Sequence, residues 1–344
     1  MLFGFELDIT LAIGLFILST IFIAVGGTSL TRQADKLADL TGFGEAMVGA
    51  ILLGAITSLS GIVTSVTAAY EGHPQLSVSN AIGGIAAQTV FLAIADITYR
   101  KANLEHAAAS MPNIMQTLLL IAILVLVLLS GDLPSLSLFH IHPTSFIIIL
   151  LYILGQRMVS KSKSHPMWQA VETKETKRDV PDEKNITEND LATVSLKFIL
   201  FGAVIAVSGY VLAQSAIVIS GTTGLSEGVM GALFTAVASS LPELIVSVSA
   251  VRQGALTLAV SNVIGGNTFD VLFVSFSDMA YTEGSIYHTL QTSQRFTIYL
   301  TLLLTAILAL GLIYREKKGF AKIGWESVLM IAVFLAGYAI LFFI

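Results

Sequence analysis

Long apolar segments alternate with short polar ones along almost the whole chain. Ten of these segments are about as long as a helix that crosses a bilayer, namely residues 7–30, 44–70, 75–98, 112–131, 143–159, 191–218, 227–252, 255–279, 294–314 and 322–344. The pattern predicts an all-α polytopic membrane protein of about ten transmembrane helices. Residues 1–159 form the first five-helix repeat in this reading, residues 191–344 form the second, and a polar linker at 160–190 joins them.

The composition agrees with this class. Hydrophobic residues make up 55% of the 344 residues and charged residues only 12%, against about 25% charged residues in soluble domains. The chain has no cysteine, which excludes disulfides and thiolate metal sites. We expect no cofactor and no nucleic acid, because the basic residues are spread over several loops and form no single patch. We expect the protein to be embedded in a lipid bilayer, and no sequence feature indicates a particular protein partner.

The basic residues predict the orientation. Of the 18 Lys and Arg residues, 17 fall in loops on one side of the predicted membrane, and Arg295 is the exception. Basic residues concentrate in cytoplasmic loops. We therefore expect an integral protein of the plasma membrane with both termini outside and the linker in the cytoplasm.

A stretch of the first half reappears in the second half. Residues 45–96 and 227–278, aligned without gaps, agree at 18 of 52 positions. The predicted orientation makes the two copies antiparallel, so they form an inverted repeat. Transporters built in this way bind their substrate near the membrane midplane, where the two copies meet.

The seventh predicted span carries a carboxylate next to a proline. Pro242 cannot donate a backbone hydrogen bond and frees the carbonyl of Ala238, so we expect the helix to break near its centre. Glu243 follows directly. A carboxylate at the centre of a bilayer costs about 2.5–3.5 kcal/mol on insertion scales. Such a residue therefore indicates a functional site, although a protonated structural Glu is the alternative.

The eighth predicted span supplies a second carboxylate. Asn262, Gly266 and Asp270 are spaced by four residues and share one helical face. Close helix packing explains the glycines but not the carboxylate of Asp270. Oxygen ligands of this kind suit hard cations such as Ca²⁺ or Na⁺.

The Ser-Ser-Leu-Pro-Glu run at 239–243 and the Asn-x-x-Gly-Gly-Asn-x-x-Asp run at 262–270 resemble the second α-repeat of the cation/Ca²⁺ exchanger superfamily, the sodium/calcium exchangers. The resemblance covers both repeats and the ten-span layout. It implies that Glu243 is a central ligand of Ca²⁺ or Na⁺, that Ser239 offers its backbone carbonyl, and that Ser240 and Asp270 line Na⁺ or proton sites. The second Asn of this motif, Asn267, is the remaining candidate ligand of the second repeat.

The first repeat departs from the family pattern. Thr57 and Ser58 match it, but Ser60 replaces the expected proline and Gly61 the expected glutamate. Gln88 stands where the family has Asn and keeps an amide oxygen. The implied site therefore combines Glu243 and Asp270 with the polar groups of Thr57, Ser58, Ser239, Ser240, Gln88 and Asn267.

These residues predict a secondary antiporter, and not an enzyme, that exchanges Ca²⁺ against Na⁺ or H⁺ by alternating access. Because Gly61 removes a carboxylate, an exchanger of the same fold with another cargo is the alternative: a monovalent cation, protons only, or a divalent ion such as Mg²⁺ or Mn²⁺. A scaffold that has lost transport is a third reading. An intramembrane serine enzyme is disfavoured, since no histidine lies at membrane depth to activate Ser60.

Four acidic residues match across the repeat outside these motifs. Glu45 and Glu227 each precede a predicted span, where a negative charge favours the helix N-terminus. Asp96 and Asp278 lie at span ends, and we expect them to be interfacial anchors.

Overall fold

The computed structural model describes residues 7–41, 55–99, 103–134, 136–164, 188–254, 256–316 and 324–344. The first half contains α1 (Ile9–Thr41), α3 (Leu59–Tyr70), α4 (Pro74–Thr98), α5 (Leu104–Ala108), α6 (Met111–Ser130) and α7 (Pro143–Ser164). Among these residues the only β-pairing is one isolated bridge between Leu138 and Ile141. The predicted all-α class is confirmed.

The second half repeats this order with more interruptions. It contains α8 (Glu188–Thr223), α9 (Glu227–Val229), the π-helix η2 (Met230–Thr235), α10 (Ala236–Ser239), α11 (Leu241–Gln253), α12 (Leu256–Asp270), α13 (Leu272–Ala280), the 3₁₀ turn η3 (Ile286–Thr289), α14 (Thr292–Tyr314) and α15 (Trp325–Leu341). The linker predicted at 160–190 is helical where its two ends are described, since α7 continues to Ser164 and α8 begins at Glu188. Its central part, 165–187, lies outside the described residues.

Seven of the described helices are long and apolar enough to cross a membrane, or eight if the bent pair at 227–253 counts as one span. The shorter apolar helices α3 and α15 correspond to the second and tenth predicted spans. Residues 44–54 of the second span lie outside the described residues. The chain is therefore a polytopic membrane protein, and the count of ten spans stays a prediction.

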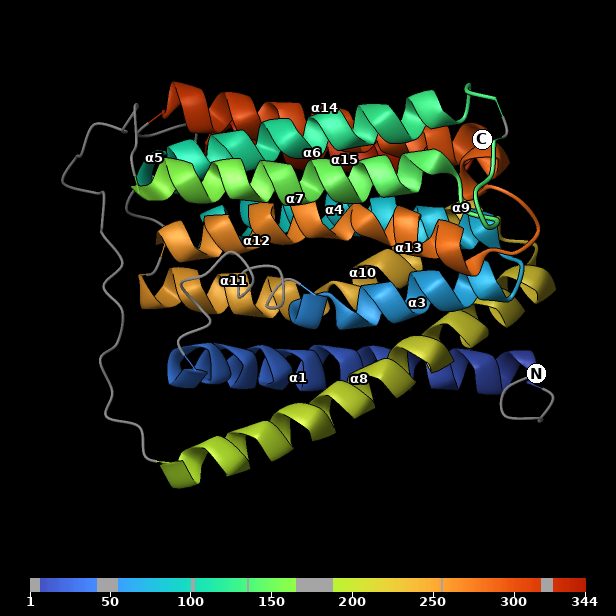
Figure 1. Cartoon of the computed structure of the whole chain (residues 1–344), viewed down its shortest axis with the longest axis horizontal. Coiled ribbons are helices and arrows are strands. Elements are labelled where there is room, and N and C mark those ends of the chain that lie inside the picture. Colours follow the sequence, from blue (N-terminus) through green and yellow to red (C-terminus); the bar gives the residue numbers. More distant parts are fainter. Residues whose placement is uncertain are drawn as a thin grey trace.

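The two halves run in opposite directions. In Figure 1, α3 runs from the middle of the bundle toward one end, while α10 and α11 run the other way. The helices α4 and α12–α13 are antiparallel in the same view. The start of α1 and the end of α15 lie at one end of the bundle, opposite the end of α7 and the start of α8. This is the inverted repeat expected from the sequence.

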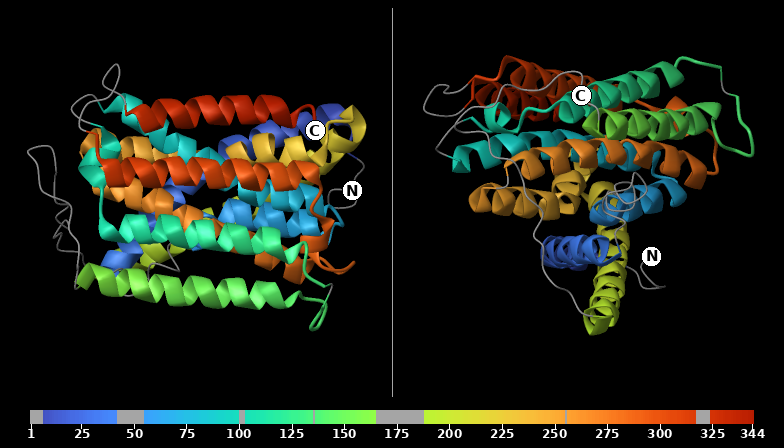
Figure 2. Two further views of the ribbon diagram at one scale, coloured as in Figure 1. Left: turned by 90° about the horizontal axis from the view of Figure 1, so that it is seen from above. Right: turned by 60° about the vertical axis from the view of Figure 1, so that its left-hand side comes forward.

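The helices form three layers. In Figure 1, α1 and α8 lie on one side, α6, α7, α14 and α15 on the other, and the repeat helices between them; Figure 2 shows α1 and α8 projecting from the rest. The central helix α4 is buried along nearly its whole length. It approaches η2 so closely that a Cβ added at Gly83 would lie 2.4 Å from the carbonyl oxygen of Ala232. That carbonyl accepts a hydrogen bond from Tyr338 Oη at 2.8 Å.

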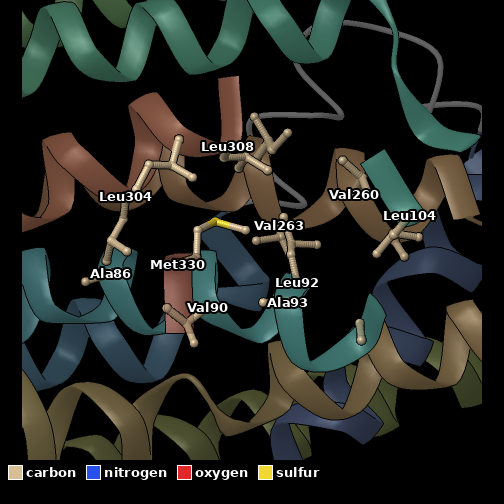
Figure 3. Close-up of a cluster of buried hydrophobic side chains, with 14 of the residues drawn as sticks. Ala86, Val90, Leu92, Ala93, Leu104, Val260, Val263, Leu304, Leu308 and Met330 are labelled. Atoms are coloured by element: carbon tan, nitrogen blue, oxygen red, sulfur yellow. The ribbon is translucent and has the colours of Figure 1, made fainter. Parts of the chain in front are cut away.

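One apolar core joins α4 and α5 to α12, α14 and α15. Figure 3 shows its side chains, among them Leu92, Val263, Leu304 and Met330. These residues come from both halves of the chain. Burying them against one another therefore fixes the position of α4, the helix that carries Gln88, relative to the second repeat.

Candidate cation site

Both copies of the repeat are interrupted at equivalent serines. Ser240 separates α10 from α11 with φ −99° and ψ 5°, and the two helical segments meet at a bend of 45°. This confirms the break expected beside Pro242. Ser58, 182 residues earlier, precedes α3 with nearly the same backbone angles, φ −91° and ψ 13°. The first break therefore forms without a proline.

The two breaks surround a small cavity in the middle layer. Its volume is about 10 Å³, room for about one water-sized particle. It is lined by Ser58, Gly61, Asn80, Gly84, Gln88, Ser239, Ser240, Glu243, Asp270 and Phe273. The structure thus brings together six of the eight predicted ligand residues. The two carboxylates, on α11 and α12, share this one cavity.

The cavity wall is rich in oxygen atoms that have no hydrogen-bond donor. Glu243 and Asp270 are only 6% and 2% exposed, so solvent does not compensate their charges. Oε2 of Glu243, Oδ1 of Asp270, Oε1 of Gln88 and Oδ1 of Asn80 are all buried without a partner. Buried polar atoms in native structures are nearly always satisfied. Four unsatisfied acceptors around one space therefore fit a bound cation or water.

Gln88 and Asp270 occupy equivalent positions in the two repeats and bind each other. Gln88 Nε2 donates to Asp270 Oδ2 at 2.6 Å and lies 3.3 Å from Ser240 Oγ. The amide of the first repeat therefore partly neutralises the carboxylate of the second. One oxygen of each side chain remains free for a ligand.

An aromatic ring fills the place of the missing first-repeat carboxylate. A Cβ added at Gly61 would lie 2.7 Å from Cε2 of Phe273. The site is therefore asymmetric in shape as well as in charge. The sequence showed the loss of the glutamate but not the ring that replaces it.

Ser60 contacts the backbone group that the resemblance implies as a ligand. Its Oγ donates to the carbonyl oxygen of Ser239 at 2.9 Å. That carbonyl keeps one lone pair for a cation. Asn80, which sequence reasoning did not propose as a ligand, lines the cavity. Its Nδ2 donates to Ser65 Oγ at 2.8 Å, and its Oδ1 is buried without a partner.

Two predicted ligand residues are not in the cavity wall. Thr57 is half-buried beside it, and Asn267 donates through Nδ2 to Thr89 Oγ1 at 2.9 Å. Oδ1 of Asn267 is buried without a partner. Neither residue reaches the space shared by Glu243 and Asp270.

The matched acidic residues outside the motifs have other surroundings. Asp96 and Asp278 are completely buried, so the expectation that they are interfacial anchors is wrong. Each accepts three hydrogen bonds from neighbouring loops and helices. Glu227 begins α9 and pairs with His73 Nδ1 at 2.5 Å. Its repeat partner Glu45 lies outside the described residues.

Comparison with known proteins identifies the family. The sequence profile described as "Sodium/calcium exchanger protein" matches residues 11–156 and 194–343, most of the chain. The chain belongs to the sodium/calcium exchanger protein family. The resemblance seen in the motifs is thereby confirmed, and with it the expectation of a transporter and not an enzyme.

Several individual proteins are similar to the chain. An uncharacterized membrane protein of Methanocaldococcus jannaschii is 24% identical over 335 residues, covering 96% of this chain and 97% of its own length. The sodium/calcium exchanger MaX1 of Methanosarcina acetivorans is 27% identical over 157 residues, which is 46% of this chain and 43% of MaX1.

Two solved structures share the fold. The sodium-calcium exchanger NCX_Mj superposes with a TM-score of 0.61 at 19% identity, over 96% of this chain and 99% of its own. The H⁺/Ca²⁺ exchanger CAX gives a TM-score of 0.70 at 14% identity, over 99% of this chain and 87% of its own. The architecture described above is therefore that of a membrane exchanger.

Proposed function

We propose that this family member is a secondary antiporter that exchanges Ca²⁺ against Na⁺ or H⁺ at the cavity of Glu243 and Asp270. The observation that carries the proposal is the set of unpartnered oxygen atoms around one cavity, two of them from buried carboxylates. Hard cations bind oxygen ligands of this kind. The names of similar proteins, which include Na⁺/Ca²⁺ and H⁺/Ca²⁺ exchangers, support the same class of cargo.

Competition for the two carboxylates explains exchange. Two buried negative charges require about two compensating positive charges, because uncompensated charges in a low-dielectric region are costly. In charge, one Ca²⁺ meets this need, and so do two protons or two Na⁺. The cavity has room for about one water-sized particle, so Ca²⁺ and a competing metal ion do not occupy it together. Each ion therefore enters only when the other has left, and alternating access turns this competition into antiport.

The asymmetry of the site favours a second candidate, an exchanger of the same fold with another cargo. The ring of Phe273 lies against Gly61, so the first repeat supplies no carboxylate to the cavity. A site with less negative charge suits a monovalent cation or protons, or another divalent ion such as Mg²⁺ or Mn²⁺. Direct binding of Ca²⁺, Mg²⁺, Mn²⁺, Na⁺ and K⁺ to the purified protein separates the two candidates.

The functional test is ion flux into vesicles that contain the purified protein. With an outward Na⁺ or proton gradient, the wild type should accumulate radiolabelled Ca²⁺. Glu243→Gln keeps the shape of the side chain but removes its charge, and it should abolish this uptake. Glu283→Gln is the matched control, because Glu283 is an exposed carboxylate in the loop after α13. Uptake retained in Glu243→Gln would overturn the assignment of the site.

A further inference from the structure

Each end of the molecule contains a buried aspartate that accepts hydrogen bonds from three groups, and these groups are equivalent in the two repeats. Asp96 Oδ1 accepts from Leu104 N at 2.8 Å, and its Oδ2 accepts from Gly324 N and Ser327 Oγ, both at 3.0 Å. At the opposite end, Asp278 holds the three repeat-equivalent groups. It accepts from Ile286 N at 3.0 Å, His142 N at 2.8 Å and Ser145 Oγ at 2.7 Å. Each partner differs in number by 182 from its counterpart, so the repeat extends into the fifth helix of each half.

Beside this shared motif, the two ends carry different side chains. At the end of Asp278, Tyr287 Oη lies 2.9 Å from Ser145 Oγ and 3.4 Å from Ser275 Oγ. At this end no second carboxyl group stands beside the aspartate at these positions: Ser145, Tyr287 and Ser275 form a chain of hydroxyl contacts, and Thr144 Oγ1 is buried without a partner. At the end of Asp96, the residue equivalent to Tyr287 is Glu105, and Glu326 replaces Thr144.

The acidic end is buried but incompletely satisfied. Glu105 is 1% exposed, and neither of its carboxyl oxygens has a hydrogen-bond partner. Glu326 is fully buried; its Oε1 accepts from Asn103 Nδ2, and its Oε2 has no partner. The side chain of Asn103 joins the two residues, since it accepts from Glu105 N at 3.1 Å and donates to Glu326 Oε1. Two carboxyl groups with three unpartnered oxygens are thereby brought together between α5 and the start of α15.

No described cation compensates these groups. Arg315 directs Nη2 to the carbonyl oxygen of His106 at 3.0 Å, and His106 Nδ1 lies 2.8 Å from the carbonyl oxygen of Arg315. Among the described residues that act on Glu326, Glu316 is also negative. Burial raises the pKa of Glu105 well above its ordinary value, and the nearby charges of Asp96 and Glu326 raise it further. Since no cation of the described residues lies between them, two neighbouring carboxyl groups cannot both ionise at low cost.

We propose that Glu105 and Glu326 form a proton-binding site at the linker end of the molecule, with one proton shared between their carboxyl groups. The protonated group donates to the carboxylate of the other, and Asn103 and the Asp96 motif hold the pair in place. The proton comes from solution at that face of the protein and returns there. The site is separate from the cation cavity, since Asp96 follows Gln88 on α4 by eight residues, or about 12 Å of helix.

Loss of this proton leaves two neighbouring negative charges in a buried region. Glu326 also packs against α14, where a Cβ added at Gly311 would lie 2.7 Å from its Cγ. Because the pKa of Glu105 is raised in the folded protein, the stability from the proton is fully present below the pKa of the unfolded chain. It is lost as the pH rises through the raised value. The site thus makes the link between Asn103, at the start of α5, and Glu326 of α15 sensitive to pH.

The test is infrared difference spectroscopy of the full-length purified protein as the pH is raised. The wild type should lose a protonated-carboxyl band that is absent from Glu105→Gln and from Glu326→Gln. Glutamine keeps the shape and neutrality of the protonated side chain, so both variants should fold and should show a flatter dependence of Tm on pH. Tyr287→Phe, at the equivalent place in the other end, should keep the band. Glu243→Gln should also keep the band, which would show that the band does not come from Glu243 in the cation cavity.

Two results would overturn the proposal. One is a band of unchanged size in both Glu105→Gln and Glu326→Gln, which would show that neither group holds a proton. The other is loss of the same band on adding Ca²⁺ at constant pH in the Glu243→Gln background, which would make the pair a metal site. Neither result would bear on Ca²⁺ flux through the cavity, so the proposed function would stand or fall independently.

Discussion

At the scale of single residues, the cation site depends on the equivalent positions at which the two repeats carry different residues. The equivalent residues Gln88 and Asp270 bind each other, and the equivalent residues Gly61 and Glu243 both line the cavity. The second repeat therefore provides the charges. The first repeat provides neutral groups that hold those charges in position.

The contact of Gly61 with Phe273 leads to the first prediction. Restoring the family glutamate by Gly61→Glu should destabilise the protein by about 1–3 kcal/mol, the cost of overpacking, because its Cβ would meet the ring at 2.7 Å. The single variant should therefore not bind Ca²⁺ more tightly. The double variant Gly61→Glu/Phe273→Ala should fold and bind Ca²⁺ more tightly than Phe273→Ala alone, as calorimetry would show. Equal affinity in these two variants would contradict the prediction.

At the scale of elements, symmetric glycines let the two long outer helices approach the two breaks. A Cβ added at Gly27 on α1 would lie 2.4 Å from Cγ of Pro242, and one at Gly209 on α8 would lie 3.0 Å from the carbonyl oxygen of Ser60. Gly27 and Gly209 are 182 residues apart, as are Ser60 and Pro242. Each outer helix thus packs on the break of the other half of the chain.

This packing predicts a specific effect of one methyl group. Gly27→Ala should lower the free energy of unfolding by about 1–3 kcal/mol and reduce Ca²⁺ flux, because α1 must move away from Pro242. Gly14→Ala on the same helix is the matched control, since a Cβ there meets nothing within 4 Å. Thermal unfolding and vesicle flux check both variants. A Gly27→Ala protein as stable and as active as Gly14→Ala would argue against this close contact.

The pair of His73 and Glu227 predicts a pH dependence at the other end of the cavity layer. The hydrogen bond to Glu227 raises the pKa of His73, and burial opposes this effect only in part. The stability from the pair is therefore fully present below the ordinary histidine pKa of about 6.5 and is lost as the pH rises through the raised value. Tm should fall over this range in the wild type.

The control for this pair is a second histidine. His73→Gln should show a smaller fall of Tm with pH, whereas His140→Asn should behave like the wild type, because His140 is exposed and asparagine tolerates its positive φ of 69°. The same slope in His73→Gln and wild type would exclude the pair as its source.

At the scale of the whole molecule, the repeat and the apolar pattern made the architecture predictable, and the site was predictable in part. The matches at Ser58 and Ser240 predicted where the helices are interrupted, and the motifs of the second repeat identified Glu243 and Asp270. The hydrogen bond from Ser60 to the Ser239 carbonyl and the ring over Gly61 depend on how one half packs against the other. A pattern within one segment carries no information on such contacts.

The positions of two repeat-equivalent aspartates led to a wrong prediction of their exposure. Asp96 and Asp278 lie at helix ends, where water is ordinarily close, yet α5 and α15 cover the first, and α7 and η3 cover the second. Burial at a span end follows from the elements that fold back over it. The short elements α5 and η3 carry no apolar periodicity that would predict where they lie, and the sequence pattern does not say which span ends α7 and α15 cover.

The charge of the site makes a prediction about the whole transport cycle. With two carboxylates in the cavity, exchange of one Ca²⁺ for two monovalent ions leaves its net charge unchanged. Transport should then move no net charge across the membrane. Electrical recordings from vesicles adsorbed to a solid support should show Ca²⁺ uptake without current, and a sustained current would show that additional ions move with each cycle.

Equilibrium Ca²⁺ binding to the purified protein, measured by calorimetry with Na⁺ or protons as competitor, tests the central claim most directly. We expect saturable binding that Na⁺ or low pH displaces, that Glu243→Gln and Asp270→Asn each abolish, and that Glu283→Gln leaves unchanged. Undiminished Ca²⁺ binding in both carboxylate variants would contradict the assignment of the cavity as the cation site.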